Sequence, residues 1–148
     1  MNVCILGEQS DQLDEGMKNL SIQLHNRLNK KGVDATLVDL REIGSTEFWK
    51  TLSRISPDIV HLVPGPTAKG LVLLRTLSLV KGCETVATVT QPRFSQFSRR
   101  AVPYLRPSLV YVQSETEQSR FNTLGCRTEF LPSGVDLTQF SPSDQNSR

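Results

Sequence analysis

Short apolar runs alternate with longer amphipathic segments along the chain, and this alternation predicts strands that alternate with helices. The first run, residues 3–6, is apolar without a break, which is typical of a parallel strand buried on both faces. Beyond polar residues 8–15, apolar side chains recur every three or four positions, as in an amphipathic helix. Continuing in this way predicts six strands, at residues 3–6, 33–40, 58–63, 85–90, 109–112 and 128–131.

The helices predicted between these strands complete an α/β pattern. They cover residues 17–31, 47–55, 68–80, 96–105 and 115–124, and the helix at 68–80 is apolar on most sides, so we expect it to be largely buried. The pattern predicts a Rossmann-like, doubly wound, parallel six-stranded sheet flanked by helices, with a strand order near 3-2-1-4-5-6. Residues 1–133 would form this domain, and the polar residues 134–148 a tail or the start of an interdomain linker.

Composition narrows the class of protein without naming a function. The chain has 148 residues, with 17 Lys or Arg against 15 Asp or Glu, a balance too even to predict nucleic-acid binding. No apolar run approaches the ~20 residues of a membrane-spanning helix. The three cysteines are widely spaced and form no C-x-x-C pair. They are interpreted as reduced, mostly buried thiols of a cytosolic protein, with metal or redox chemistry as the alternative.

Several common motifs are absent from the sequence. Gly7 is followed by Glu8-Gln9-Ser10 instead of the glycine turn of a dinucleotide-binding loop, and no phosphate-binding G-x-x-x-x-G-K-[ST] loop occurs. No G-x-S-x-G nucleophile elbow is present. In a doubly wound sheet, ligands bind beyond the carboxyl ends of the strands. Candidate chemistry is therefore expected in the loops at residues 7–16, 63–67, 91–94, 113–115 and 132–136.

Two of these regions allow a functional and a structural interpretation. Glu15 and Gly16 open the first helix, where free N–H groups could bind a phosphate, or where acids could simply complement the helix dipole. Residues 91–107 mix arginines with aromatic residues and contain no acid. They could contact an anionic acceptor or a membrane surface, or they could form an ordinary solvated helix with its aromatics packed inward. The arginines are Arg93, Arg99, Arg100 and Arg106.

Three segments resemble a known enzyme family. Ser56-Pro57-Asp58-Ile59-Val60-His61 resembles the "PDIVH" strand in the N-terminal half of retaining GT-B glycosyltransferases of family 4. The segment from Leu109 to Glu115 resembles the strand whose serine, here Ser114, opens the next helix. The segment from Pro132 to Pro142, P-S-G-V-D-L-T-Q-F-S-P, resembles the family's P-N-G-V-D-x-x-x-F-x-P and is the most specific of the three.

The resemblance implies that the chain is the acceptor-binding, N-terminal half of a GT-B fold. Such an enzyme moves a sugar, with retention, from a nucleotide-sugar donor to a hydroxyl of a glycan, lipid or small molecule. The donor would be shared with a C-terminal domain, without which the chain is expected to be inactive, and neither a metal nor another cofactor is implied. Glu15 and Gly16 would lie near the donor. The acceptor or cleft residues would be His61, Gln91, Arg93, Ser114, Gly134 and Asp136.

Two departures from the family pattern keep a second hypothesis open. Gln91 stands where many relatives carry a histidine, and Ser133 stands where asparagine is usual, so no catalytic residue is assigned. The alternative is a non-catalytic α/β binding or interaction module that kept the fold and lost the chemistry. For His61, a buried structural hydrogen bond competes with a role in orienting a cleft loop. The expected location is the cytoplasm, with peripheral contact at the inner face of the membrane through Arg93, Arg99, Arg100 and Arg106 as a further hypothesis.

Overall fold

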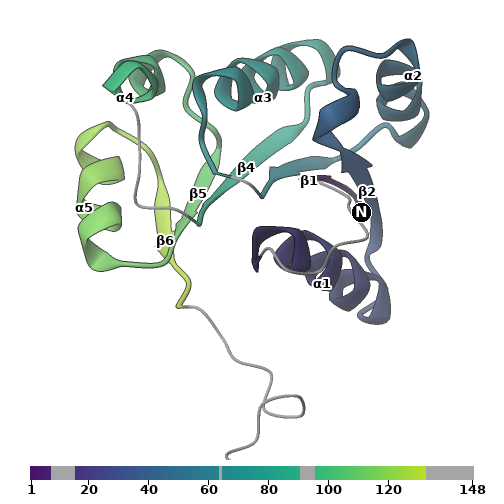
Figure 1. The fold of residues 1–148 in the computed structure, drawn as a ribbon, viewed down its shortest axis with the longest axis horizontal. Coiled ribbons are helices and arrows are strands. Elements are labelled where there is room, and N and C mark those ends of the chain that lie inside the picture. Colours follow the sequence, from purple (N-terminus) through teal and green to yellow (C-terminus); the bar gives the residue numbers. More distant parts are fainter. Residues whose placement is uncertain (8–15, 64, 91–95, 133–148) are drawn as a thin grey trace, which may run out of the picture.

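The computed structural model describes residues 1–7, 16–63, 65–90 and 96–132, and it confirms the α/β class. One six-stranded, wholly parallel sheet forms the centre of the molecule, with helices on both of its faces (Figure 1). The elements are β1 (Asn2–Gly7), α1 (Gly16–Lys30), β2 (Asp34–Asp39), η1 (Leu40–Glu42), α2 (Thr46–Ile55), β3 (Ile59–Leu62), α3 (Ala68–Lys81), β4 (Glu84–Val89), α4 (Gln96–Ala101), η2 (Val102–Tyr104), β5 (Leu109–Val112), α5 (Glu115–Thr123) and β6 (Thr128–Phe130).

The strand order is β2-β1-β3-β4-β5-β6, so the expected order 3-2-1-4-5-6 was wrong in the position of the third strand. Instead of extending the sheet beyond β2, the chain returns across β1, and β3 pairs with β1 from Val3↔Ile59 to Leu6↔Leu62. Helix α2 connects β2 to β3, and its buried Phe48 packs in one cluster with Cys4 of β1 and Val38 of β2. The point at which the strand order reverses therefore lies between β1 and β3.

The two faces of the sheet are covered unequally. Helices α2, α3 and α4 lie together on one face (Figure 1), and Phe121 of α5 packs into the same layer against Val110 and Val112. On the other face, α1 packs over β1 and β2, where Leu20, Leu24 and Leu28 meet Val3 and Ile5. Across β3, β4 and β5, no described helix covers this second face, which leaves a hollow beside α1.

Capping residues account for the start of several helices. The side chain of Thr67 accepts a hydrogen bond from the Gly70 N–H (3.1 Å) at the start of α3, and Gly82 ends that helix at φ 67°. Such a glycine relieves the strain of a left-handed backbone. The three cysteines, Cys4, Cys83 and Cys126, are free and buried, as expected. Burial, reinforced by the nearby Cys83, raises the pKa of Cys4 to about 12, so that thiol stays protonated.

Helix α3 is less buried than its composition suggests. Leu71, Leu73, Leu74 and Leu77 are buried against the sheet, but Val72, Leu79 and Val80 are 51%, 68% and 71% exposed. A helix in the outer layer of a two-faced sheet can bury only the side that meets the strands. The expectation of a largely buried helix was therefore correct for one side of α3 and wrong for the other.

Candidate functional site

Close packing of α1 on the end of β1 helps to shape the carboxyl edge of the sheet. A Cβ atom on Gly7, the last residue of β1, would lie 2.7 Å from the Cβ atom of Ser21 on α1. No side chain other than hydrogen fits between the strand and the helix at that point. Gly7 thus serves as a packing glycine, a role that its sequence context did not reveal because no second glycine follows it.

The connection from β3 to α3 is tied down by its own backbone. The Val63 N–H donates to the Leu6 carbonyl (3.1 Å), and the Thr67 N–H donates to the carbonyl of Gly65 (2.9 Å), which adopts φ 97°. Gly70 continues this tight packing, since a Cβ there would lie 2.6 Å from Leu62 Cδ2. The predicted loop at residues 63–67 is therefore held beside the point where the strand order reverses, apart from Pro64, which lies outside the described residues.

The start of α5 brings a buried carboxylate to the same edge of the sheet. Ser114 caps this helix by accepting a hydrogen bond from the Glu117 N–H (3.2 Å). Glu117 is only 7% exposed, and its Oε1 accepts a hydrogen bond from Arg120 Nη1 (2.7 Å). Its other oxygen, Oε2, is buried and has no hydrogen-bond partner within the described parts of the chain. Buried polar atoms are normally paired, so this oxygen is a candidate to accept a hydrogen bond from a ligand.

A second unpaired polar atom follows the neighbouring strand. Thr90 comes directly after β4, and its buried Oγ1 also lacks a partner among the described residues. Strands β4 and β5 are adjacent, with Val89 opposite Val112, so Thr90 and the start of α5 both lie at their carboxyl ends. In sequence, Ser114 followed three residues later by Glu117 matches a capping box, in which the serine and the glutamate cap the start of the helix. Because that pattern assigns the glutamate to the helix itself, sequence analysis did not single out Glu117 as a site residue.

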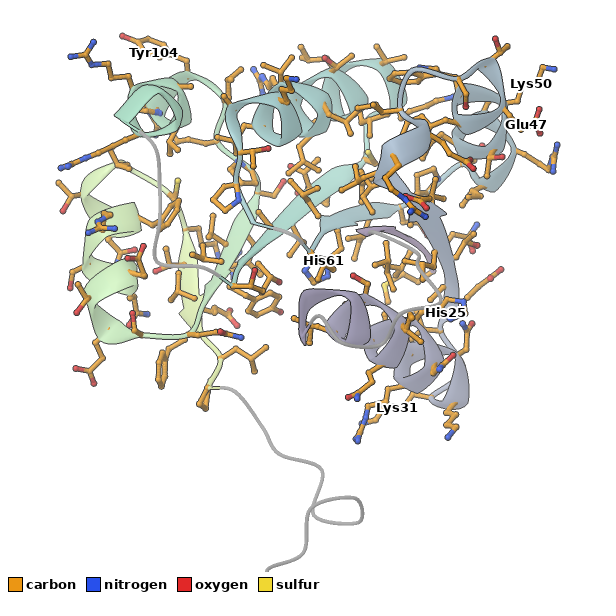
Figure 2. All side chains as sticks on the ribbon, in the orientation of Figure 1. His25, Lys31, Glu47, Lys50, His61 and Tyr104 are labelled. Atoms are coloured by element: carbon orange, nitrogen blue, oxygen red, sulfur yellow. The ribbon has the colours of Figure 1, made fainter. Side chains whose placement is uncertain are left out.

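His61 lies on the face of the sheet that α1 packs against, away from this edge. Its neighbours Val60 and Leu62 point toward α3, so by strand alternation His61 points to the opposite face, below the sheet on the side of α1 (Figure 2). There its Nε2 lies 2.7 Å from Thr88 Oγ1, and its ring lies 6.1 Å from that of Tyr111. Burial lowers the pKa of His61 from 6.5 to about 4, so the imidazole is neutral at pH 7. The structure thus contains a structural hydrogen bond for His61, the alternative to a role in orienting a cleft loop.

The hollow around His61 has a volume of about 640 Å³ and a mainly apolar lining. It runs between α1 and the same face of β3, β4 and β5, where Thr88 is buried and His61 and Tyr111 are half-buried, and it reaches Leu131 and Pro132 after β6. Both faces of a parallel sheet are normally covered. Within the described residues, α1 packs on this face over β1 and β2. The lining residues outside α1 are Met1, Val3, Ile59, His61, Val63, Val86, Thr88, Tyr111, Gln113, Leu131 and Pro132.

The predicted site residues are only partly within the described structure. Gly16 begins α1, Ser114 caps α5, and His61 lies in the hollow, so the structure does not bring these three to a single point. Arg99 and Arg100 are exposed on α4. Arg106 donates from Nε to the Pro103 carbonyl (2.9 Å) and from Nη1 to the Gly125 carbonyl (3.2 Å), which ties η2 to the turn before β6. The predicted residues outside the described ranges are Glu15, Gln91, Arg93, Gly134 and Asp136.

Neither a metal site, nor a membrane-spanning helix, nor a relative indicates what this protein does. In the described ranges, no three His, Cys, Asp or Glu side chains come together to hold a metal ion. None of the helices described above combines the length and apolar character needed to cross a bilayer. Comparisons with protein-family models, with curated proteins and with solved structures found no match.

Proposed function

We propose that this chain is the acceptor-binding domain of a retaining glycosyltransferase that takes its sugar from a nucleotide-sugar donor. The proposal joins the sequence resemblance to the fold. Residues 59–61 of the resembling segment Pro57–His61 fall in β3, beside the reversal of strand order, and Ser114 caps α5 as the resemblance implies. The glycosyl acceptor would be a hydroxyl group of a glycan, lipid or small molecule.

The observation that carries the proposal is the unpaired oxygen of Glu117 at the carboxyl edge of the sheet. A carboxylate oxygen can only accept hydrogen bonds, and a sugar hydroxyl can donate one. Thr90 Oγ1 can donate or accept, and it lies at the end of the neighbouring strand. Hydrogen bonds that involve a charged group are about twice as strong as neutral ones, which suits the selection of one hydroxyl among many. Both oxygens are closed to solvent in this structure, so acceptor binding requires the groups that cover them to move. With that movement, we assign Glu117 and Thr90 to acceptor binding.

The other assignments follow from the resemblance and from chemistry. Gly16 would leave its backbone open to the donor phosphates, with Glu15 beside it, and Gln91 would hydrogen-bond the acceptor or the transferred sugar. Arg93 would bind phosphate through two parallel hydrogen bonds. Gly134 and Asp136 would shape the cleft. A C-terminal domain would supply the rest of the donor site. We expect the enzyme to act in the cytoplasm.

The test is a transfer assay on the protein made from its complete gene, with UDP-glucose and GDP-mannose among the donors and with release of the nucleoside diphosphate as the readout. In Glu117→Gln, the side chain keeps its size but loses its charge. Losing one hydrogen bond to a charged group should raise the acceptor KM about 10- to 100-fold. Glu115→Gln is the matched control, because it removes one acid from an exposed position of the same helical turn.

The outcomes separate the two functional hypotheses. An increased acceptor KM in Glu117→Gln, with an unchanged value in Glu115→Gln and equal thermal stability in both, supports the proposal. If no donor is consumed and the gene encodes no second α/β domain, the enzyme proposal fails. The non-catalytic binding module, which Gln91 and Ser133 favour through their departure from the family pattern, would then replace it.

A further inference from the structure

The outward side of α3 carries a stripe of exposed basic and aliphatic side chains. We define the α3 stripe as Lys69, Val72, Arg75, Thr76, Leu79 and Val80, all of which are exposed, while Leu71, Leu73, Leu74 and Leu77 of the same helix are buried. The stripe therefore faces away from the sheet. Val72, Leu79 and Val80 are each more than half exposed.

The order of residues around the helix separates the two kinds of side chain. At 3.6 residues per turn, each residue is rotated by about 100° from the last, and the stripe covers an arc of about 140°. Leu79 and Val72 lie near the middle of this arc, with Arg75 on one side of them and Lys69 on the other. Long basic side chains can lay their methylene stems along an apolar surface while the charge reaches outward. The stripe thus has an aliphatic centre with a basic residue on each side of it, and Val80 lies beyond Lys69 at the end of the arc.

The helices on either side of α3 extend the positive charge. Figure 1 shows α2, α3 and α4 as one layer, which we call the outer helical layer. Its three helices contain seven basic residues and one acid, Glu47, whose Oε2 lies 3.8 Å from Lys50 Nζ. Helix α5, which packs on the same face and carries Glu115, Glu117 and Arg120, is not part of this layer as defined. The whole chain has 17 basic and 15 acidic residues, so the remainder has 10 basic and 14 acidic ones. The seven are Lys50, Arg54, Lys69, Arg75, Lys81, Arg99 and Arg100.

Aromatic side chains lie toward both ends of the same layer. Trp49 of α2 is 42% exposed, with its ring Nε1 donating to the Ile43 carbonyl (3.1 Å). Tyr104, in η2 after α4, is 83% exposed and points away from the sheet (Figure 2). Tryptophan and tyrosine favour the boundary between lipid and water, because their rings combine an apolar body with a polar atom.

We propose that the outer helical layer docks on an anionic phospholipid membrane, with Val72 and Leu79 at the centre of the contact. Basic residues near an anionic leaflet are attracted to it, and aliphatic side chains between them can enter the headgroup region. A second copy of the same face is a poor partner, because two strongly positive layers repel. A nucleic acid would meet the cations but leave the aliphatic centre in water. This inference does not depend on the glycosyltransferase proposal.

The surface differs from the contact expected from sequence. That expectation rested on Arg93, Arg99, Arg100 and Arg106. The structure retains Arg99 and Arg100 in the layer, while both Nε and Nη1 of Arg106 donate to backbone carbonyls of the protein itself. The α3 stripe was overlooked because its aliphatic residues were expected to be buried.

The experiment measures sedimentation of the protein with vesicles made of equal parts phosphatidylcholine and phosphatidylserine, and with vesicles of phosphatidylcholine alone. The wild type should sediment with the anionic vesicles only, and less at high salt, because screening shortens the reach of charge from about 10 Å at 0.1 M to about 3 Å at 1 M. Each basic residue near the surface contributes about fivefold to partitioning, so Lys69→Glu/Arg75→Glu should lower it at least about 25-fold.

Two further variants test the position and the chemistry of the surface. Lys30→Glu/Lys31→Glu changes the net charge equally, at the end of α1 on the other face of the sheet, and should leave most of the binding intact. Val72→Ser/Leu79→Ser removes the aliphatic centre at exposed positions and should lower partitioning about tenfold. Circular dichroism verifies that each variant is folded.

Three results would overturn the proposal. One is the absence of sedimentation with anionic vesicles. Another is an equal loss in the Lys30/Lys31 and Lys69/Arg75 variants, which would mean that net charge, not this face, is responsible. The last is full binding by Val72→Ser/Leu79→Ser, which would reduce the contact to charge alone and leave a nucleic acid or acidic protein as an equally good partner.

Discussion

Acidification should destabilise the fold through His61. This side chain lies in the hollow beside α1, with Nε2 2.7 Å from Thr88 Oγ1, and burial lowers its pKa from 6.5 to about 4. In the unfolded chain, the imidazole binds a proton once the pH falls below its ordinary pKa of 6.5. In the folded chain it does so only near pH 4. Between these values unfolding takes up a proton, so the stability contributed by neutral His61 is present above pH 6.5 and is lost as the pH falls.

The size of this effect follows from the two pKa values. One pKa unit corresponds to about 1.4 kcal/mol, so the full difference corresponds to roughly 3 kcal/mol, reached only below the folded-state pKa. Between about pH 7.5 and about pH 5, linkage predicts a loss of about 2 kcal/mol in the free energy of unfolding from this residue. That is a large part of the stability of a typical domain, which is about 5–15 kcal/mol.

Urea denaturation at the two pH values measures the loss, with the fluorescence of Trp49, the single tryptophan, as the signal. Other groups also titrate, so the test compares variants. His61→Gln places an uncharged side-chain amide near Thr88 and should remove about 2 kcal/mol of the wild-type pH dependence. His25→Gln makes the same substitution at the only other histidine, on α1, and should keep that dependence. Equal pH dependence in the wild type and in His61→Gln would refute the argument.

Two further predictions concern packing and capping. Gly7→Ala should lower the free energy of unfolding by about 1–3 kcal/mol, because a Cβ there would lie 2.7 Å from the Ser21 Cβ; urea denaturation measures it. Gly44→Ala, where a Cβ would meet nothing within 4 Å, is the control, and an equal loss in the two variants would contradict the packing argument. Thr67→Ala should cost about 1 kcal/mol by removing the cap of α3, whereas Thr67→Ser should cost less; an unchanged melting temperature in Thr67→Ala would show that the cap contributes nothing.

Local patterns in the sequence were sufficient to predict the elements of the fold. The apolar run at residues 3–6 and the serine that opens the helix after residue 114 both depend on neighbouring residues, and the structure has both as predicted. The strand order could not be predicted in the same way, because it depends on which strands the connecting helix crosses in the folded chain. The apolar residues Phe48 and Leu52 show that α2 buries one side, but nothing in their spacing shows that α2 would carry the chain back to β1.

The candidate site was harder to predict, because its chemistry depends on which buried polar atoms lack a hydrogen-bond partner in the folded chain. Glu117 fits a helix cap by sequence, and only the structure shows that one of its oxygens is buried and unpaired. His61 ends a motif that suggests a cleft, yet strand alternation places it in the hollow with Thr88. The sequence also did not predict the exposed side of α3. Composition gives the number of aliphatic residues in a helix, but it does not show which of them another element of the fold covers.

The central claim is that the carboxyl edge of this sheet binds the hydroxyl acceptor of a sugar transfer. The most direct test uses the complete gene product and determines the anomeric configuration of the sugar that it transfers, by proton nuclear magnetic resonance. We predict transfer from a nucleotide sugar with the configuration retained, weakened acceptor binding in Glu117→Gln, and wild-type kinetics at neutral pH in His61→Gln. An inverted product would contradict the proposed reaction, as would the absence of transfer from every nucleotide sugar tried. Loss of acceptor binding in His61→Gln, with Glu117→Gln unaffected, would move the site from the carboxyl edge to the hollow.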